Sequence, residues 1–579
     1  MSKEPALKDI LEYTPQPLRF GTSGVRAKVT ELTDIEVYCL TRGTLAYFEQ
    51  TGKITCNSGS ADAIAIPLAG DLRPSTERLL QATAKAIADA GYQVDYVGRI
   101  PTPALTYYAL QKGVASFVVT GSHIPADRNG QKANRCDGEV LKSDEAGIVR
   151  AVSAFRDQEY NRPAGQSLFD AKGMFKPQFK YPLPDSNPSA AEVFQSRYRK
   201  VFPTDALKGL RVLFFEYSAV GRELIPQILE NAGAEVVRAG RSEEFIPLDT
   251  EAISDHHLQM LADLAGQQSG QFDAIVSTDG DSDRPLVIGL QQSGGETKLQ
   301  FIPGDLLGAI VADALKADAV AVPISANPAL EEFFNTRGIS VLRTRIGSPY
   351  VIEAMETLKS QGKQRVMAWE ANGGFLLGSA ITLEKGVLEP LPTRDATLPM
   401  LTVLQVANQR QIPLAQLLRE FPPCYGKSDL LDEFPQEDSR LMVEFFKPED
   451  DRIKTLEFVD GAVRLLDADN RKVGVWPQES GQAKSWLEKK RLLESVFSPA
   501  EGFAEIVKIN VLDGIRCYFA NGEIAHVRPS GNAPQLRIYA FASTPERARE
   551  IAALAVKEPD GLLRRLQALV VEKGSNGTV

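Results

Sequence analysis

The chain has 579 residues, of which 43% are hydrophobic and 24% are charged. It is therefore too long for one hydrophobic core, and we expect about three to five folding units, while the ordinary composition excludes wholesale disorder and a fibrous architecture. The formal net charge is -10 and no basic block interrupts the sequence, which argues against nucleic acid and anionic membranes as partners.

The cysteines and the apolar runs indicate the compartment. The five cysteines lack CxxC or Cys/His ligand spacing and are expected to be reduced thiols: Cys39, Cys56, Cys136, Cys424 and Cys517. The N-terminal sequence MSKEPALKDILEY has no apolar core, and no run reaches the roughly 18 apolar residues that a membrane helix needs. We therefore expect a soluble, cytoplasmic protein.

The first part of the chain alternates predicted strands and helices. A loop at 19–26, RFGTSGVR, offers backbone N–H groups and guanidinium donors to an anion, although a plain strand-entry turn is the alternative. Strands are predicted at 63–68, 93–97 and 115–120, with one helix capped by Ser75 or Thr76 and ended by Gly91, and another at 103–112. This repeated βαβ pattern predicts a largely parallel sheet.

Ser122 comes just past the carboxyl end of the strand at 115–120, in the sequence TGSHIP, and an irregular loop is expected to follow. In an open α/β sheet this edge faces the ligand crevice. A hydroxyl there, beside His123 and shortly before Lys132, is placed for nucleophilic chemistry. The alternative is a turn whose serine and histidine merely satisfy backbone groups.

The rest of the chain repeats this alternation and then changes. The hydrophobic periodicity fades over residues 156–188, which predicts a linker or a long surface excursion there. A second α/β unit has predicted strands at 211–216, 235–238 and 272–277 and a helix at 223–231; a third has a helix at 306–315, capped by Asp305, and strands at 319–324, 340–346 and 365–369. Each unit ends a strand in a polar loop, which indicates a cryptic internal repeat.

The C-terminal part has a different residue pattern. Residues 427–498 include many charged residues and show no strong periodicity, and we expect an insertion or an elaborated domain entry there. Short strands at 504–511, 515–520, 523–527 and 535–541, a hairpin at Asn521-Gly522 and a helix from about residue 544 predict a small α+β domain.

Asp279, Asp281 and Asp283 place three carboxylates on alternate residues after a predicted buried strand. Such an oxygen cage suits Mg²⁺ or a similar divalent ion. A calcium loop of the EF-hand type is excluded, because Arg284 stands where glycine is required and a strand precedes the loop. A solvated acidic turn is the alternative, but three repelling carboxylates after a buried strand are hard to explain without a cation.

Two further loops offer polar groups. RPSGNAP at 528–534 carries the donors that a phosphate dianion needs, and EANGG at 370–374 carries a carboxylate and an amide suited to adjacent sugar hydroxyls. Taken singly, these loops are also compatible with an ordinary hairpin and a strand end with exposed polar tips.

Together, four loops in this order resemble the α-D-phosphohexomutases, the phosphomannomutase and phosphoglucomutase superfamily. TGSHIP is similar to the phosphoserine loop, DGDSDR to the metal loop, EANGG to the sugar-recognition loop and RPSGNAP to the phosphate loop, and the resemblance runs from Phe20 to about Tyr539. It implies a heart-shaped architecture of four domains, three related α/β domains and a C-terminal α+β domain, expected at 1–185, 190–300, 301–425 and 426–579.

The resemblance also implies a role for each loop. Ser122 would carry the phosphoryl group and complete a site for one Mg²⁺ with Asp279, Asp281 and Asp283. Arg284 would orient the phosphoserine, Arg26 and Lys132 would handle acid–base and charge work around the transferring group, and His123 is counted with these catalytic residues. Glu370 and Asn372 would hold sugar hydroxyls, and the non-reacting phosphate would be held by Arg528, Ser530, Gly531, Asn532 and Arg537.

The implied reaction interconverts hexose 6-phosphate and hexose 1-phosphate through a phosphoserine and a hexose 1,6-bisphosphate, which also serves as activator. Overall resemblance to bacterial phosphomannomutases favours mannose, with glucose phosphates as the alternative. Two other classes stay open, a sugar-phosphate phosphatase and a non-catalytic sugar-phosphate-binding protein. The expected partner is a hexose phosphate, with no nucleic acid or membrane, and the protein is expected to be a monomer or a homodimer.

The chain departs from the family pattern in the lining of these loops. Alanine is common where Gly121 stands, asparagine where Ile124 stands and serine where Asn372 stands, while some members have histidine in place of Ser348 and Gly374. These departures leave the nucleophile in place. The sugar specificity and the acid–base roles are therefore the parts that the resemblance determines least.

Overall fold

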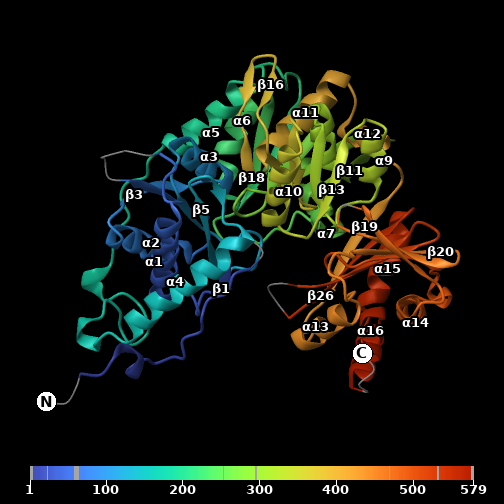
Figure 1. The fold of residues 1–579 in the computed structure, drawn as a ribbon. Coiled ribbons are helices and arrows are strands. Elements are labelled where there is room, and N and C mark those ends of the chain that lie inside the picture. The colour runs from blue at the N-terminus through green and yellow to red at the C-terminus, as the bar shows by residue number, and fades with distance from the viewer. Residues whose placement is uncertain are drawn as a thin grey trace. The chain divides into compact units, whose positions relative to one another are not determined.

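The computed structural model describes residues 4–21, 24–57, 64–251, 253–293, 296–468, 470–530 and 534–575, and Figure 1 labels many of their helices and strands. The chain divides into two units, Met1–Ala319 with Gly347–Arg419, and Val320–Ile346 with Glu420–Val579. The four domain ranges expected from the sequence stay a prediction.

The first sheet has the strand order β1-β5-β4-β2-β3, with β6 paired to β5. Its strands are β1 Val25–Lys28, β2 Ala65–Gly70, β3 Gln93–Arg99, β4 Ser116–Val119, β5 Arg128–Arg135 and β6 Gly138–Glu139. β2 is parallel to β3 and β4, but β5 is antiparallel to β1, β4 and β6. The sheet is thus mixed rather than largely parallel, because the short connection from β4 to β5 leaves no room for a crossover helix.

Helices cover this sheet: α1 Asp34–Thr51, α2 Thr76–Asp89, α3 Thr102–Lys112 and α4 Lys142–Tyr160. Helices α1, α2 and α4 lie together (Figure 1). After α4 the chain makes two short 3-10 turns, Ala164–Gln166 and Pro177–Phe179, before α5 Ser189–Arg199. Phe169 and Phe175 are buried here, with ring centroids 5.6 and 6.0 Å from that of Tyr38. The segment predicted as a linker or surface excursion therefore contributes to the core.

Cys56 and Cys136 form a disulfide with their Cα atoms 5.6 Å apart, so the prediction of five reduced thiols is wrong for this pair. The two residues are 80 positions apart in the sequence, and spacing alone does not reveal them. Backbone hydrogen bonds from Cys56 N–H to Gly113 and from Cys136 N–H to Lys53 bring them together. Cys39, Cys424 and Cys517 are not part of this disulfide.

The second sheet has the order β11-β10-β9-β7-β8. Its elements are β7 Arg211–Tyr217, α6 Leu224–Asn231, β8 Glu235–Arg241, α7 Asp255–Gly266, β9 Ala274–Thr278, β10 Pro285–Ser293 and β11 Glu296–Phe301. β7 is parallel to β8 and β9, and β10 returns antiparallel to β9. The order of β7 to β10 repeats that of β2 to β5, so the predicted internal repeat is present in the topology of these two sheets.

The first unit also contains β14 Val366–Trp369, β15 Phe375–Leu377 and β18 Leu391–Asp395, paired antiparallel in that order. A hairpin and four helices accompany them: β16 Ile381–Leu383, β17 Gly386–Leu388, α8 Gly304–Ala314, α10 Ser348–Ser360, α11 Thr397–Arg410 and α12 Leu414–Leu417. Helix α8 has Pro303 as its N-cap, and the Asp305 carboxylate accepts from the N–H of Leu306 instead of capping the helix as predicted.

The second unit begins within β12 Ala319–Pro323 and contains α9 Ala329–Asn335 and β13 Ser340–Thr344. Its antiparallel sheet has the order β19-β26-β25-β24-β23-β20-β21-β22. The strands are β19 Tyr425–Leu431, β20 Thr455–Val459, β21 Ala462–Leu466, β22 Lys472–Pro477, β23 Ile506–Asn510, β24 Ile515–Phe519, β25 Ile524–Pro529 and β26 Leu536–Ala542. The helices are α13 Gln436–Phe445, α14 Gly481–Val496, α15 Pro545–Val556 and α16 Leu562–Ser575.

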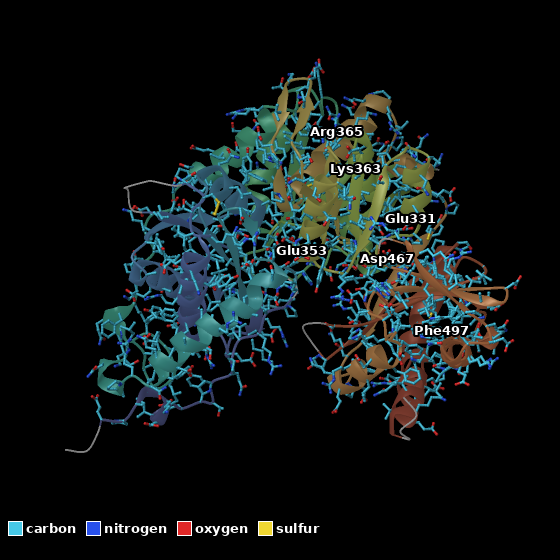
Figure 2. All side chains as sticks on the ribbon, viewed as in Figure 1. Glu331, Glu353, Lys363, Arg365, Asp467 and Phe497 are labelled. Carbon is cyan, nitrogen blue, oxygen red and sulfur yellow. A yellow bond between two sulfur atoms is a disulfide. The ribbon has the colours of Figure 1, made fainter. Side chains whose placement is uncertain are left out.

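The insertion expected at 427–498 extends this sheet with β20, β21 and β22 and adds α13 and α14. Phe497, labelled in Figure 2, packs in the core of the unit with ring centroids 5.3 Å from Phe503 and 6.0 Å from Phe519. In the described part of the whole chain, no helix is long and apolar enough to span a membrane.

Candidate active site

Ser122 lies on the loop after β4 in a left-handed backbone conformation, with φ 57°. A non-glycine residue keeps this conformation only where its surroundings hold it. The Ser122 N–H donates to Thr120 Oγ1 at 2.8 Å, and its carbonyl accepts from Arg73 Nη2 at 2.9 Å. Arg73 also donates to the carbonyls of Pro125 and Arg128, at 2.7 and 2.9 Å. The nucleophile loop is therefore built around one buried guanidinium.

Arg73 also explains one departure from the family pattern. A Cβ added at position 121 would lie 2.6 Å from the Arg73 guanidinium carbon, and Gly121 avoids this contact. Arg73 itself is held by Asp71, whose carboxylate oxygen lies 3.2 Å from Arg73 Nε. Sequence reasoning missed this pair, although a charged GDLR sequence directly after a buried strand is a usable signal.

The Ser122 hydroxyl donates to Asp279 Oδ2 at 2.7 Å. His123 Nδ1 lies 3.3 Å from the same hydroxyl oxygen but accepts a hydrogen bond from Arg284 Nη1 at 2.8 Å. Because a guanidinium only donates, Nδ1 is an acceptor and the ring proton of His123 is assigned to Nε2. The single hydroxyl proton of Ser122 is thus bound by Asp279 rather than by His123.

Asp279, Asp281 and Asp283 are buried on the loop between β9 and β10, and a ligand oxygen from each lies within 4.8 Å of the others. Lys132 Nζ, on β5, donates to Asp281 Oδ2 at 2.7 Å and to Asp283 Oδ2 at 2.9 Å. Among the described residues, the second oxygen of each of these two carboxylates has no hydrogen-bond partner. Buried carboxylate oxygens left open in this way fit a divalent cation.

The three carboxylates differ in proton affinity. Burial, together with repulsion from Asp281 and Asp283, raises the pKa of Asp279 well above its usual value. Burial would also raise the pKa of Asp281, but the Lys132 ammonium outweighs it and the net pKa is lowered. For Asp283, burial is outweighed chiefly by Arg394, so its pKa is lowered too. The carboxylate that faces Ser122 is therefore the one most ready to hold a proton.

Further cations line this network. Arg284 Nε lies 3.8 Å from Asp279 and 3.7 Å from Asp283. Burial and the nearby Arg284 charge lower the pKa of Arg26 to about 10. Thr102, which sequence reasoning missed, donates from Oγ1 to Asp281 Oδ2 at 2.8 Å. A buried hydroxyl beside a proton acceptor, cations and open carboxylate oxygens is an arrangement suited to phosphoryl transfer.

The predicted sugar-binding residues lie on the loop between β14 and β15. Glu370 Oε2 accepts from Arg394 Nη1 at 2.8 Å, which links Glu370 to the carboxylate network because Arg394 also binds Asp283. Asn372 Oδ1 accepts from the Gly374 N–H at 3.0 Å, so this amide oxygen stabilises the turn of the loop that carries it. Both side chains are buried in the first unit.

The predicted phosphate-binding residues belong to the second unit. Arg528 lies near the end of β25 opposite Arg537 on β26, and Ser530 follows β25. Arg528 Nε is 3.2 Å from Asp513 Oδ2, whose carboxylate also accepts from the Ile346 N–H at 2.9 Å. The predictions for Gly531 and Asn532 lie outside the described residues.

Four family models match consecutive parts of the chain. They are described as phosphoglucomutase/phosphomannomutase alpha/beta/alpha domains I, II and III, at residues 17–159, 192–292 and 303–425, and the corresponding C-terminal domain, at 479–558. The matches follow one another in the order of the four motif loops.

Similar curated proteins and solved structures carry related names. A phosphomannomutase of Sinorhizobium fredii is 35% identical over 92% of this chain and 97% of its own length, and one of Salmonella muenchen is 33% identical over 92% and 94%. The structure of a putative phosphomannomutase from Thermus thermophilus has a TM-score of 0.62 at 17% identity, covering 96% of this chain and 100% of that one. An Aspergillus fumigatus N-acetylphosphoglucosamine mutase, solved with GlcNAc-6P and magnesium, has a TM-score of 0.52 at 14% identity over 99% and 100%. These two structures share the fold.

Proposed function

The chain belongs to the phosphoglucomutase/phosphomannomutase family, a family of isomerases that transfer a phosphoryl group, and from this premise we propose that it interconverts mannose 6-phosphate and mannose 1-phosphate. The observation that carries the proposal is the Ser122 hydroxyl, bound to Asp279 at 2.7 Å inside a buried network of carboxylates and cations. Mannose is favoured over glucose by the identity to two phosphomannomutases along nearly their whole length. A cytoplasmic location stays part of this proposal.

Magnesium is the cofactor that we propose for this site. Asp279, Asp281 and Asp283 would hold it together with an oxygen of the phosphorylated Ser122, and the two carboxylate oxygens without hydrogen-bond partners support this assignment within the described residues. When bound, the ion offsets negative charge on the transferring group. Lys132 shares two of these carboxylates and adds a positive charge beside them.

The transfer step needs an enzyme that starts phosphorylated. A hydroxyl oxygen of the hexose phosphate attacks the phosphorus, the bond from phosphorus to Ser122 Oγ breaks, and the hydroxyl proton passes to a base of the site. The resulting hexose 1,6-bisphosphate reorients, and its other phosphoryl group returns to Ser122. We assign Arg26, Lys132 and Arg284 to charge stabilisation, with His123 next to the nucleophile.

Substrate recognition is divided between two sets of residues in this proposal. Glu370 and Asn372 would hold the sugar hydroxyls. The non-reacting phosphate would be held by donors of the C-terminal loop, namely Arg528, Ser530, Gly531, Asn532 and Arg537.

Intact-protein mass spectrometry before and after incubation with glucose 1,6-bisphosphate tests the proposal. We expect one added phosphate on the wild type and on Ser360→Ala, a control whose hydroxyl donates to a helix carbonyl, and none on Ser122→Ala. Coupled assays with mannose 1-phosphate and glucose 1-phosphate then identify the sugar. A phosphate on Ser122→Ala, or on none of the proteins, would contradict the phosphoserine mechanism; release of inorganic phosphate without isomerisation would indicate a phosphatase.

A further inference from the structure

Arg394, on β18, connects two loops that lie far apart in the sequence, and it belongs to none of the four motifs. Its side chain is only 3% exposed. Nη1 donates to Glu370 Oε2 at 2.8 Å, while Nε and Nη2 lie 3.0 and 2.9 Å from Asp283 Oδ2. One guanidinium therefore ties the sugar-recognition loop to the carboxylate loop, both within the first unit.

The glycine at position 374 makes room for this side chain. A Cβ added there would lie 2.6 Å from Arg394 Cδ, 2.7 Å from Cγ and 3.0 Å from Cβ. These atoms form the stem of the side chain, and they cannot swing away while the guanidinium is held at both ends. Gly374 does not have a positive φ, so the site needs glycine for its small volume rather than for its backbone freedom. Gly374 and Arg394 thus form a size-matched pair.

The Arg394 guanidinium also determines the position of the Glu370 carboxylate. A buried carboxylate without a partner is costly, and in the described structure Arg394 supplies a side-chain partner for Glu370. Nη1 makes one hydrogen bond to Glu370 Oε2, while Nε and Nη2 of the same planar group are held by Asp283, so the donor reaches Glu370 from a fixed position that a single ammonium does not provide. Loss of this group would free the Glu370 side chain and leave its charge uncompensated.

We propose that Arg394 is a positioning residue for hexose recognition: it orients the Glu370 carboxylate toward the sugar and anchors it to Asp283, and Gly374 is the residue that admits it. This inference rests on the proposed function, since it assigns Glu370 to the sugar. Arg394 acts through Glu370 and Asp283 and needs no contact of its own with the substrate.

The affinity for mannose 1-phosphate, measured by calorimetry in the Ser122→Ala background, tests the inference without turnover. We expect Arg394→Met to weaken binding by about tenfold or more, as supporting residues of this kind commonly do. Arg394→Lys should recover part of the loss. Gly374→Ala should weaken binding as well, whereas Gly374→Ala combined with Arg394→Met should bind no worse than Arg394→Met alone, because methionine has no guanidinium held at both ends and its stem can turn away from the added methyl group.

Gly378→Ala is the matched control. It crowds Met355 Sδ and the Val366 carbonyl, each 3.0 Å from the added Cβ, and it should lower stability without changing affinity. Wild-type affinity in folded Arg394→Met, or in Gly374→Ala if the first variant does not fold, would overturn the inference. Failure of the proposed function would give another result. The wild type would then bind the sugar phosphate, and Arg394→Met would weaken that binding, but the wild type would convert neither mannose nor glucose phosphates.

Discussion

At the scale of single residues, Arg73 shapes the nucleophile loop, because it donates to four backbone carbonyls, those of Ser122, Ile124, Pro125 and Arg128. Arg73→Met leaves these buried acceptors without their donor. We expect the free energy of unfolding to fall by about 2–4 kcal/mol, and the rate of Ser122 phosphorylation to fall at least about tenfold. Urea unfolding and time-resolved mass spectrometry measure the two effects.

Lys53→Met is the control for this variant. Lys53 lies in the same unit and pairs with Asp137 at 2.6 Å, with side chains 34% and 38% exposed, so its loss should cost about 1 kcal/mol or less. Equal phosphorylation rates in Arg73→Met and the wild type would show that the loop keeps its shape without the guanidinium.

His526 predicts a pH dependence of stability. It is fully buried on β25, its Nε2 donates to the Asp513 carbonyl at 2.6 Å, and burial lowers the pKa of His526 to about 3. The unfolded chain binds this proton near pH 6.5, so stability is lost as pH falls from about 6.5 toward 3. At pH 5 the loss from this group is about 2 kcal/mol.

The measurement is urea unfolding at pH 7 and pH 5. His526→Gln should show a smaller difference between the two pH values than the wild type, whereas His256→Gln, at an exposed position, should show the same difference as the wild type. A difference unchanged in His526→Gln would mean that other groups produce the acid sensitivity.

At the scale of elements, the Cys56–Cys136 bond fastens the turn after α1 to the end of β5. It closes a loop of 80 residues, for which the chain-entropy relation gives up to about 4.5 kcal/mol. We expect a reductant to lower the unfolding temperature of the wild type but not of Cys56→Ser. Thiol titration in denaturant should give three reactive groups before reduction and five after it, and five before reduction would contradict the pairing.

Strands could be predicted where their buried side chains are apolar, and a strand was missed where its buried side chains are polar. The strands before Ser122 and before Asp279 have continuous apolar runs, and each polar loop at their ends was found. Strand β5, RNGQKANR, has no such run, because its buried positions are polar: Gln131 donates to the Thr41 and Thr83 hydroxyls at 2.9 and 2.7 Å. Arg73 and Arg394 escaped prediction for a related reason, since their partners lie tens of residues away or more.

At the scale of the whole molecule, every proposed Mg²⁺ ligand belongs to the first unit, while the phosphate loop belongs to the second. A ligand that binds only the folded state stabilises the unit that holds it. Binding of the ion should therefore be visible as stability of the first unit, independently of catalysis.

We accordingly expect Mg²⁺ to raise the unfolding temperature of the wild type after chelator treatment, with a gain of about 2.7 kcal/mol when the ion is at one hundred times its dissociation constant. Asp281→Asn should abolish the shift, because it removes one of three carboxylates and leaves Lys132 to neutralise the rest. Asp89→Asn, which alters a partly buried pair with Lys85 in the same unit and away from the three carboxylates, should keep it. A shift that survives in Asp281→Asn would place the ion elsewhere, since a site built on these carboxylates cannot lose one without losing affinity.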